Sequence, residues 1–438
     1  MKIAMSSYTG MGAWFVLRLL AEGHQVDYYL SEQKYEDVLS GLVPPPKILS
    51  LDHRRTQRGY GYPSYKEYDL SLFDLTGRAK QADASRLEAP TIGDGSFEHW
   101  LEDDREAGIQ AMERCKINVP PYQKFNNPAE AKAFVQKNDK RYVYKPFTIG
   151  SDMQDVATTY VAKDAKDLTR VIDQLFVISK SAPFILQEFI EGTEASVAGF
   201  FNGKEFYMLT CTLEEKKFMN DNKGPNTGCS GNLVFAISEE SKLYRDGLKR
   251  AIPLLQEAGF TGMIDLNTIV TEGTAYGLEW TPRFGYLADS TIAAMYGTGY
   301  GAMLAAVASG KVPEIKWTAP YGYSVQLSIP PYPTEIRLPK AKDVPIEGID
   351  PRDIEQLQRC YLYDAKLAPE KNAEPHLITS GNYGYIGAPI GIGDSIQEAA
   401  SRCEGMVKNI QIPNMQYRTD IQKSTYKRYN FLEENGWL

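Results

Sequence analysis

The sequence predicts a multidomain protein that combines an α/β domain with α+β units, and three observations lead to this prediction. The chain has 438 residues, which is more than one hydrophobic core usually holds, so roughly two to four domains are expected. Strand and helix patterns alternate at the start of the chain, as they do in a doubly wound sheet. Farther on, the turn sequences Asn202-Gly203 and Thr271-Glu272-Gly273 each separate two strand patterns, which predicts β-hairpins in an antiparallel sheet.

Residues 1–100 are predicted to form the doubly wound N-terminal domain, which is Rossmann-like. Its first elements are expected at residues 2–7 (strand), 13–21 (helix), 25–30 (strand) and 68–75 (strand). Gly10 and Gly12 begin a pattern typical of dinucleotide-binding turns, but Phe15 occupies the position of the third glycine. A tight turn that leads into a helix explains these glycines better than a nicotinamide-dinucleotide site.

Residues 101–313 are predicted to form a central domain, and residues 314–438 a C-terminal α/β domain. A small α+β lobe at about residues 115–190 is expected to precede the larger antiparallel sheet. The helices in and before this lobe are predicted at 102–116, 128–136 and 164–176, and its strands at 141–147 and 184–190. Hairpins at 195–212 and 262–284 are expected to build the larger sheet, followed by strands at 324–329 and 385–392 and a helix at 395–409.

Charge and hydropathy exclude several classes of function. The net charge is −8 at pH 7, so the chain as a whole repels nucleic-acid phosphates. The strongest basic grouping is interpreted as a solvated loop, and it comprises Lys47, His53, Arg54, Arg55 and Arg58. No apolar run approaches the about 20 residues that span a bilayer, and the N-terminus lacks a leader pattern. We therefore expect a cytoplasmic protein, a monomer or small homo-oligomer, with small-molecule substrates and no nucleic-acid or membrane partner.

Absent motifs narrow the chemistry further. The cysteines are widely spread, without CxxC spacing, at positions 115, 211, 229, 360 and 403. This pattern predicts neither a zinc site nor a disulfide framework, and reduced thiols fit it best. No HExxH, GxSxG or GxxxxGK[ST] motif occurs. Catalysis is therefore expected to depend on carboxylates, lysines, arginines and backbone amides.

The hairpin at residues 262–284 carries the most informative charges. If residue 272 is the centre of its turn, Asp265 and Glu279 face each other on one side of the sheet, with Cβ atoms about 5 Å apart. Facing carboxylates destabilise a sheet unless a cation neutralises them, and Mg²⁺ is commonly held by carboxylates together with nucleotide phosphates. An exposed pair, or a register shifted by one residue, is the alternative. Arg283 follows on the same face, and its guanidinium suits an anionic substrate or acyl phosphate.

Several motifs resemble those of phosphoribosylamine–glycine ligase, an ATP-grasp enzyme also called glycinamide ribonucleotide synthetase. Residues 279–285 (EWTPRFG) resemble the family's E-x-N-x-R-F-G, and residues 223–228 (KGPNTG) resemble its GPNTGG loop. Residues 187–196 (QEFIEGTEAS) are similar to the family's EEFLxGxEAS, and residues 417–421 (YRTDI) to its YRxDIG. The motifs occur in the family's order, from about residue 100 to residue 421. Several motifs in one order are more specific than any single match.

The resemblance implies an ATP-grasp fold of two lobes, with ATP and Mg²⁺ between them and Mn²⁺ as a possible substitute. Lys145 would reach the ATP phosphates, because a lone lysine on an apolar strand is costly to bury without a partner. A surface lysine is the alternative. Glu194 would hold the ribose. The adenine-side hinge would be formed by Gln187, Glu188, Phe189 and Ile190.

The same resemblance implies a metal site and a reacting centre. Asp265 and Glu279 would bind Mg²⁺. The family's metal-binding asparagine is Thr281 in this chain, so Asn267, two residues from Asp265, is expected to supply the missing oxygen. The reacting centre would be formed by a flexible turn and the hairpin arginine, that is, by Asn226, Thr227, Gly228 and Arg283. Taken alone, residues 224–228 are better explained by a plain turn.

Other departures from the family concern the substrates. The glycine-rich phosphate loop after the lysine is reduced to residues 147–152, with a single glycine. The acid that follows the RFG motif is replaced by Tyr286, and Asp289 is the next acid along the chain. A phenol accepts a hydrogen bond but carries no charge at neutral pH. Glycine is therefore expected to bind poorly unless Asp289 compensates.

The function that these observations predict is an ATP-dependent ligase that joins a carboxylate to an amine through an acyl phosphate and releases ADP. Phosphoribosylamine and glycine, the pair used in purine biosynthesis, are the leading substrates. A diverged ligase for another acid or amine is the first alternative. A nucleotide-binding protein without turnover is a weaker alternative, and a nicotinamide-dependent oxidoreductase is weaker still.

Overall fold

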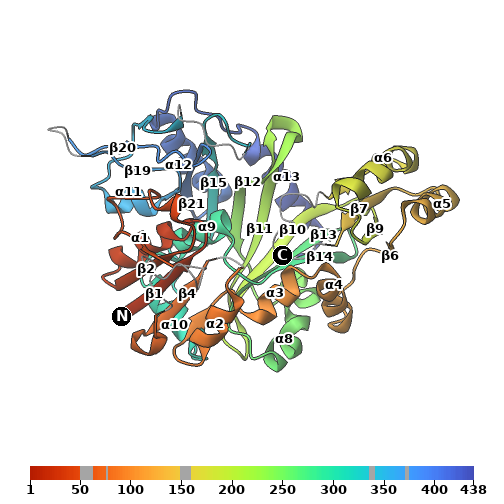
Figure 1. Cartoon of the computed structure of the whole chain (residues 1–438), viewed down its shortest axis with the longest axis horizontal. Helices are drawn as coiled ribbons and strands as arrows, with labels where there is room; N and C mark the ends of the chain where they lie inside the picture. Colours follow the sequence, from red (N-terminus) through yellow and green to blue (C-terminus); the bar gives the residue numbers. More distant parts are fainter. Residues whose placement is uncertain (50–62, 75–76, 148–158, 335–340, 370–373) are drawn as a thin grey trace.

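The computed structural model describes the 438-residue chain except for residues 50–62, 75–76, 148–158, 335–340 and 370–373. The basic cluster His53, Arg54, Arg55 and Arg58 and most of the expected phosphate loop at 147–152 therefore lie outside the described residues. Mixed α/β architecture, with separate parallel and antiparallel sheets, confirms the predicted fold class (Figure 1).

The N-terminal sheet is parallel, in the order β3-β2-β1-β4-β5. Its strands are β1 (Lys2–Ser7), β2 (Gln25–Leu30), β3 (Lys47–Ile48), β4 (Leu70–Phe73) and β5 (Thr91–Ile92), and helix α1 (Ala13–Ala21) connects the first two. The Asp74 side chain holds the turn before α1 in place. Asp74 accepts hydrogen bonds from the amides of Tyr8 (3.3 Å) and Gly12 (2.8 Å) and from the hydroxyl of Ser7 (2.5 Å). A Cβ atom at position 12 would lie 2.8 Å from the Asp74 carboxylate, which explains the glycine.

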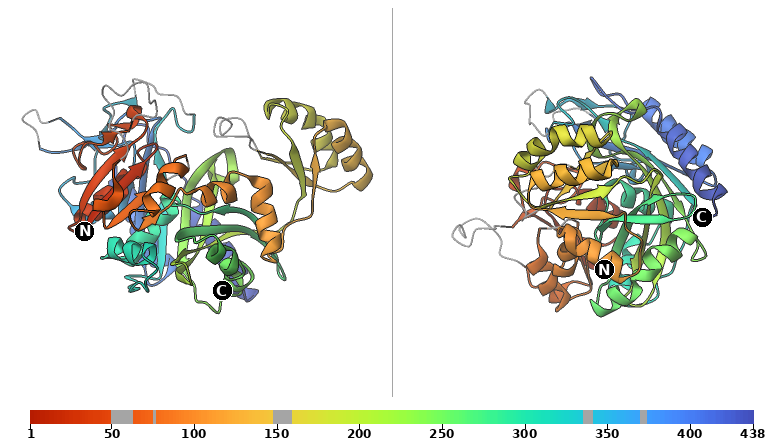
Figure 2. Two further views of the ribbon diagram at one scale, coloured as in Figure 1. Left: turned by 60° about the horizontal axis from the view of Figure 1, so that its bottom comes forward. Right: turned by 90° about the vertical axis from the view of Figure 1, so that its right-hand side faces the viewer.

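The small lobe has its own sheet and its own core. Its strands pair in the order β6-β9-β7-β8, with bounds β6 (Tyr122–Phe125), β7 (Tyr142–Pro146), β8 (Tyr160–Val161) and β9 (Phe184–Glu188). Helices α5 (Pro128–Asn138) and α6 (Ala165–Ile178) cover this sheet, and Tyr144 and Phe184 lie at the centre of a separate hydrophobic cluster. Figure 2 shows the lobe projecting away from the rest of the molecule. The elements predicted here are confirmed, apart from the single helix over 102–116.

That helix prediction is wrong in one respect. The segment forms two helices, α3 (Ser96–Glu102) and α4 (Arg105–Arg114). The Asp104 side chain accepts the amide hydrogen of Ala107 and caps the start of α4. A capping aspartate competes with helix continuation, and the periodicity of the charged residues did not reveal the break.

The central sheet is antiparallel and runs in the order β14-β13-β10-β11-β12-β15-β21-β16, with β18 paired to β21. Its strands are β10 (Thr193–Phe201), β11 (Phe206–Met219), β12 (Lys223–Ala236), β13 (Gly262–Val270), β14 (Ala275–Thr281), β15 (Tyr321–Val325), β16 (Leu327–Ser328), β18 (Cys360–Leu362) and β21 (Tyr385–Gly393). Both predicted hairpins are present, as β10–β11 and β13–β14. Strands from the C-terminal third extend this sheet, so the division at residue 314, which stays a prediction, crosses a continuous sheet.

Helices surround the central sheet. Helix α12 (Ile396–Asn409) packs on β15 and β21, and α13 (Ile421–Glu434) packs on β10, β11 and β12. The remaining helices are α2 (Ala79–Arg86), α7 (Lys242–Asp246), α8 (Leu248–Glu257), α9 (Tyr286–Tyr296), α10 (Tyr300–Ala308) and α11 (Ile354–Gln358). A small sheet of β17 (Pro345–Ile346), β20 (Leu377–Ile378) and β19 (Lys366–Leu367) completes the C-terminal region.

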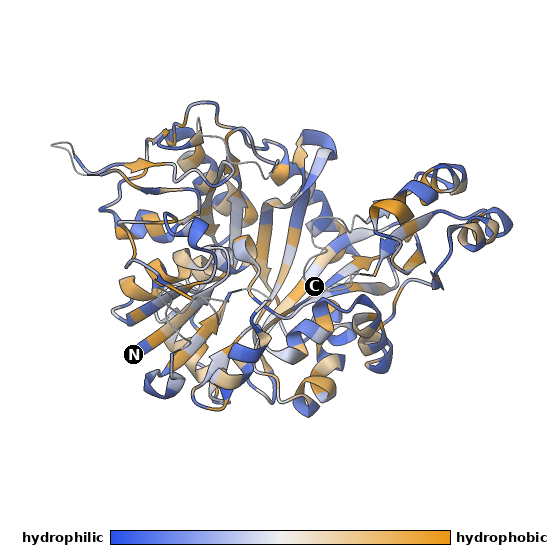
Figure 3. Ribbon diagram, in the orientation of Figure 1, coloured by the Kyte–Doolittle hydropathy of each residue, from blue (hydrophilic) through white to orange (hydrophobic). Residues whose placement is uncertain are grey.

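One hydrophobic core joins the N-terminal domain to the central and C-terminal regions. The rings of Phe15 and Phe284 lie 5.0 Å apart, and the indole of Trp14 donates to the carbonyl of Cys360. Figure 3 shows hydrophobic residues along the strands of both sheets. Within the described ranges no single helix is long and apolar enough to cross a membrane. Only α9 and α10 together pass that test, as a pair bent by 112°.

Candidate active site

Two cavities meet at one end of strands β11, β12, β13 and β14. The lobe cavity, about 840 Å³, lies between the small lobe, the central sheet and helix α13. The domain cavity, about 510 Å³, lies between the central sheet, the start of α9, the N-terminal turn and the C-terminal region. The side chains that line both cavities are Glu214, Lys216, Asn226, Asn267 and Glu279. Chemistry that couples two bound molecules would take place at this junction.

The lobe cavity contains every residue that the sequence predicted for the nucleotide, namely Lys145, Gln187, Glu188, Phe189, Ile190 and Glu194. Lys145 lies on β7 and is only 8% exposed. Burial, and then the nearby charge of Arg105, lower the pKa of its ammonium to about 8. A buried cation of this kind is stabilised by an anionic ligand such as phosphate.

The predicted hinge lies where β9 leaves the small lobe. The Phe189 amide donates to the Arg141 carbonyl (2.9 Å), and the Arg141 guanidinium lies 3.5 Å from the centre of the Phe189 ring. Lys140 binds the Glu188 carboxylate at 2.8 Å, so this side chain has a partner on the outside of the lobe. The Glu188 amide is also used, since it donates to the Pro121 carbonyl (2.7 Å). The Glu188 carbonyl and the Ile190 backbone are therefore the groups through which a hinge would bind a base.

A network of charges occupies the junction. Lys216 Nζ lies 2.5 Å from Glu194 Oε1 and 3.9 Å from Glu279 Oε1. Asn267 donates from Nδ2 to Glu194 (3.1 Å) and weakly to Glu279 (3.5 Å). Burial opposes ionisation of Glu279, but the charges of Lys216, Lys145 and Arg105 outweigh it and lower the pKa of this carboxyl. Both glutamates are therefore held as carboxylates, since Lys216 likewise lowers the pKa of Glu194 against the effect of burial.

The predicted pairing of Asp265 with Glu279 is wrong. Asp265 faces Thr281, and Asn267 faces Glu279. The turn spans four residues, with Thr271 and Thr274 hydrogen-bonded to each other, and the register shifts between Asn267 and Thr268 so that Leu278 is an extra residue. Such a bulge is not readable from strand periodicity. The three predicted metal-binding side chains nevertheless remain on one face of the hairpin.

The residues present fit a magnesium ion that is held largely by nucleotide phosphates. Asn267 Oδ1 is buried without a hydrogen-bond partner, and Glu279 lies directly opposite it. Among the residues that the structure describes, no group of three or more His, Cys, Asp or Glu side chains is arranged to hold a metal. Mg²⁺ in nucleotide sites needs fewer protein ligands than that, because phosphate oxygens and water complete its shell.

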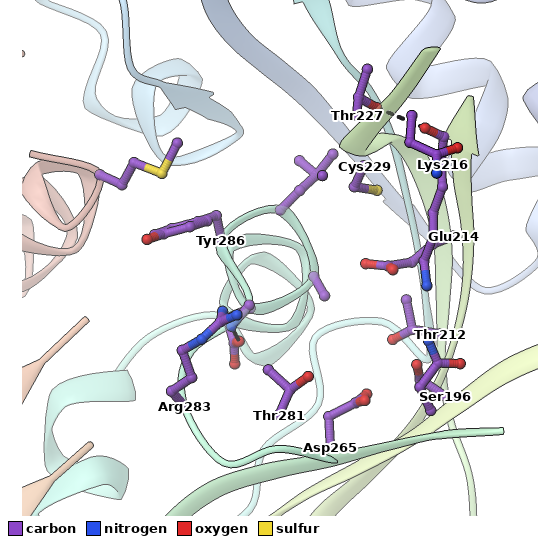
Figure 4. Close-up of a pocket in the computed structure, with 18 of the residues that line it drawn as sticks. Ser196, Thr212, Glu214, Lys216, Thr227, Cys229, Asp265, Thr281, Arg283 and Tyr286 are labelled. Carbon is purple, nitrogen blue, oxygen red and sulfur yellow. Dashed lines mark hydrogen bonds between the residues drawn. The ribbon is translucent and has the colours of Figure 1, made fainter. Parts of the chain in front are cut away.

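Asp265 lies in the domain cavity rather than in the lobe cavity. Burial, and then the charge of Glu214, raise the pKa of Asp265 well above its usual value, although Ser196 hydrogen-bonds to it. Figure 4 shows Asp265 and Thr281 below the cavity, with Ser196, Thr212 and Glu214 along one side. The raised pKa means that burial disfavours the ionised form of Asp265, and a bound cation would favour it.

The predicted turn at residues 226–228 is wrong as a secondary structure. Asn226, Thr227 and Gly228 belong to strand β12, and Asn226 pairs with Lys217 of β11. The Thr227 hydroxyl donates to the Lys216 carbonyl (3.1 Å), as Figure 4 shows. All three residues line the domain cavity, and Asn226 lines both cavities. They therefore lie beside the junction, as expected, but on a strand that extends past the turn-like sequence.

Arg283, expected to face an anionic substrate, is already paired with a carboxylate of the protein. Its Nε and Nη2 donate to Glu102 Oε1 at 3.1 Å and 2.7 Å, and its Nη1 donates to the Phe284 carbonyl at 3.0 Å. Arg283 still lines the domain cavity, opposite Glu214 (Figure 4). Because Glu102 neutralises it, Arg283 offers an anionic substrate less attraction than a free arginine would.

Sequence reasoning missed several residues of the junction. Glu214 and Lys216 alternate along β11 and point to the same face, so the run Glu214-Glu215-Lys216-Lys217 was the available signal. On the opposite face, the buried Glu215 binds Arg428 (2.6 Å) and Arg418 (3.3 Å). Arg428 also donates to the backbone carbonyls of Glu194 and Glu214. Helix α13 thereby fixes two strands that form the lobe cavity.

Comparisons with known proteins agree with this geometry. Residues 108–288 match the family model described as phosphoribosylglycinamide synthetase, ATP-grasp (A) domain. The chain is 26% identical over 341 residues to the phosphoribosylamine–glycine ligase of Ralstonia nicotianae, covering 75% of this chain and 77% of that protein. The solved phosphoribosylamine–glycine ligase of Thermotoga maritima superposes with a TM-score of 0.70 at 17% identity, covering 96% of this chain and all of that one.

A second solved structure shows how general the fold is. Biotin carboxylase of Campylobacter jejuni, described as a β-γ-ATP complex, superposes with a TM-score of 0.66 at 13% identity, covering 99% of this chain and 97% of that one. The chain thus has an ATP-grasp fold and resembles phosphoribosylamine–glycine ligases in sequence. At this level of identity the structural likeness establishes the fold, and the chemistry rests on the residues of the two cavities.

Proposed function

We propose that the chain is an ATP-dependent ligase that joins a carboxylate to an amine through an acyl phosphate and releases ADP. The observation that carries this proposal is the junction itself. Glu279, Asn267 and Lys216 line both a lobe cavity and a domain cavity, so a nucleotide in one and an acid in the other would meet at the same side chains. The resemblance to phosphoribosylamine–glycine ligases supports the same reaction class.

The lobe cavity is proposed as the ATP site. Lys145 would attract the phosphates, and the Glu188 carbonyl and the Ile190 backbone would bind the adenine edge. Glu194 would bind the ribose hydroxyls, although its contact with Lys216 means that it serves the charge network as well. Mg²⁺ would be held by Glu279 and Asn267 together with phosphate oxygens, and it would neutralise charge on the transferred phosphoryl group.

The domain cavity is proposed to hold the acid and the amine. A carboxylate oxygen of the acid attacks the γ-phosphorus, the bond to the β-phosphate oxygen breaks, and ADP leaves. The amine nitrogen then attacks the acyl carbon, inorganic phosphate leaves, and the nitrogen loses a proton. The backbone amides of Asn226, Thr227 and Gly228, which line this cavity, would stabilise the oxyanion formed in this second step. Positioning and charge neutralisation supply the catalysis, so no nucleophilic side chain is required.

The intermediate provides the test. With an accepted acid, ATP, Mg²⁺ and hydroxylamine but no amine substrate, the enzyme should form a hydroxamate in amounts equal to the ADP released. Formation of AMP and pyrophosphate would contradict the proposal. Binding of ATP without turnover of any acid would instead favour a nucleotide-binding protein.

The substrates are chosen by analogy with the relatives. Phosphoribosylamine and glycine, named in those relatives, are the first pair to test in a screen of ATP hydrolysis across amino acids, and they would place the protein in purine biosynthesis. We expect it to act in the cytoplasm, as a monomer or a small homo-oligomer. The screen identifies the acid when ADP release depends on one compound and the amine when a second compound raises the rate.

A further inference from the structure

The charges of the domain cavity are unbalanced. Its lining includes the carboxyl groups of Glu214, Asp265, Glu279 and Asp289. The lining cations that the structure describes are Lys216 and Arg283, and both are engaged. Lys216 binds Glu194 at 2.5 Å, and Arg283 binds Glu102 at 2.7 Å. Among the described residues, the lining of this cavity therefore offers no uncommitted cation to a phosphate group.

Asp289 is the carboxylate that points to a specific ligand. It lies in the first turn of α9 and is fully buried, yet it lines the cavity. One oxygen, Oδ2, accepts the amide hydrogen of Gly285, whereas Oδ1 has no hydrogen-bond partner among the described residues. An unsatisfied carboxylate oxygen at a buried site costs free energy unless a donor reaches it. Burial accordingly raises the pKa of Asp289 to about 7.

The other walls of the cavity suit an organic cation rather than a sugar phosphate. Aromatic rings and a thioether line it, from Met11, Tyr286, Tyr332, Tyr383 and Tyr385. Aromatic faces attract ammonium groups, and they offer no full charge to a phosphate. A phosphate monoester carries nearly two negative charges at pH 7, and carboxylates close to it would repel it.

We propose that the domain cavity binds its substrate through a protonated amino group held by Asp289, and that it selects unphosphorylated, ammonium-bearing compounds. This inference rests on the proposed function and narrows it to a substrate class. Amino acids and small diamines share the required ammonium group. The phosphoribosylamine named in the relatives lacks a suitable partner for its phosphate in this lining.

Binding measurements test this class independently of turnover. Titration calorimetry would use the full chain with Mg²⁺ and a non-hydrolysable ATP analogue, and the probes glycine, putrescine and ribose 5-phosphate. We expect glycine or putrescine to bind and ribose 5-phosphate to bind at least about tenfold more weakly. Glycine alone would identify an amino-acid site, and putrescine alone a diamine site. If neither amine binds, or if ribose 5-phosphate binds as tightly as the better amine, the proposal is overturned.

The variant Asp289→Asn separates ligand binding from helix capping. Its amide oxygen still accepts the Gly285 amide hydrogen, but the charge is gone. Amine affinity should fall about tenfold or more, with affinity for the ATP analogue unchanged. Asp353→Asn, which alters an exposed capping aspartate at the start of α11, is the matched control and should change neither affinity. Unchanged amine affinity in Asp289→Asn would exclude Asp289 as the ammonium partner.

Two further outcomes remain informative. If the unmodified chain does not bind the ATP analogue, the proposed ligase function is contradicted, whether or not the amines bind. Failure of the ligase proposal can therefore be distinguished from failure of the amine-site proposal. If ribose 5-phosphate binds, Arg78→Met shows where. The Arg78 guanidinium is buried without a hydrogen-bond partner outside the cavity lining. Loss of sugar-phosphate binding in this variant would assign the phosphate to Arg78 and overturn the proposed selectivity.

Discussion

The lobe cavity and the domain cavity share residues of strands β11, β12, β13 and β14, but they differ in how their charges are balanced. On the lobe side, Glu194 and Glu279 remain ionised, because Lys216 lies between them. On the domain side, burial raises the pKa of Asp265 and Asp289, because the nearby charges of Lys216 and Arg283 do not outweigh it. The lobe cavity is therefore prepared for a polyanion with its own metal ion, and the domain cavity for a cation.

The two cavities also differ in how their walls are assembled. Most of the lobe cavity comes from neighbouring strands of two sheets and from one helix. The domain cavity draws on Met11, on the start of α9 and on Tyr383, which are far apart in the chain. The domain cavity therefore depends on tertiary packing more than the lobe cavity does.

The largest expected effect is on the shared side chain Glu279. Glu279→Gln should lower kcat about 100- to 1,000-fold, because it removes the carboxylate that would hold the Mg²⁺ facing the transferred phosphoryl group, and it should weaken the dependence on Mg²⁺. Asp265→Asn should also lower kcat, but it should leave affinity for the ATP analogue unchanged, because Asp265 lines only the domain cavity. Steady-state kinetics over a Mg²⁺ series measures both.

Glu240→Gln, on an exposed glutamate that pairs with Arg245, is the control and should be neutral. Near-normal, Mg²⁺-dependent rates in both Glu279→Gln and Asp265→Asn would remove the metal assignment. An equal loss of ATP-analogue affinity in the two variants would break the distinction between the cavities.

The next effect concerns Lys145 and pH. Its ammonium has a pKa of about 8 in the free protein, and bound phosphates favour the protonated form. Affinity for ATP should therefore be highest below pH 8 and should fall as the pH rises through 8 and the lysine loses its proton. Lys145→Met should weaken ATP binding about 30- to 100-fold at pH 7. Fluorescence titration with a labelled ATP analogue, from pH 6.5 to 9.5, would follow both changes.

Lys145→Arg sharpens the same test. Arginine stays charged over this range, so this variant should lose the decline in affinity between pH 7.5 and 9. A decline of the same size in Lys145→Arg would mean that another group titrates, and Lys145 would then be a structural residue of β7.

These differences explain how much the sequence could predict. Lys145 and the segment 187–194 were predicted from local motifs on single strands, and they line one cavity. The hairpins β10–β11 and β13–β14 were predicted from their turn sequences. The prediction that Asp265 faces Glu279 was wrong, because the register of the hairpin depends on a bulge at Leu278. The pairing of Arg283 with Glu102 could not be predicted from the sequence, because α3 and the hairpin are brought together only by tertiary packing.

A smaller effect is expected at Asp289. Its carboxyl has a pKa of about 7 before ligand binds, and an ammonium stabilises the ionised form. Affinity for the amine-bearing substrate should therefore rise several-fold from pH 6 to pH 8. The charged or titratable groups that interact with Asp289 are Arg283, Asp265 and Tyr300, and Arg283 remains charged over this range. Calorimetry with the accepted amine measures the trend.

Asp289→Asn should remove most of this rise, which separates Asp289 from Asp265. A rise that persists in Asp289→Asn would assign the titration to Asp265 instead. The domain cavity would still be the site for a cation, but the ammonium would then lie deeper, beside Glu214.

The smallest expected effect is at Cys229, and it tests whether the domain cavity needs a covalent nucleophile. The thiol lines the cavity and donates to the Gly231 carbonyl at 3.3 Å. Burial, and then the charge of Glu214, raise the pKa of the thiol well above its usual value, so it stays protonated at neutral pH and is a poor nucleophile. The acidic surroundings that favour an ammonium thus suppress a thiolate at the same place.

Cys229→Ser should therefore keep kcat within about twofold, since a hydroxyl preserves the hydrogen bond. Hydroxamate formation should be equally unchanged. The contrary outcome is a loss of turnover in both Cys229→Ser and Cys229→Ala together with a loss of hydroxamate formation. That outcome would point to an acyl-thioester in place of the acyl phosphate. The cavity would then have to stabilise a thiolate anion.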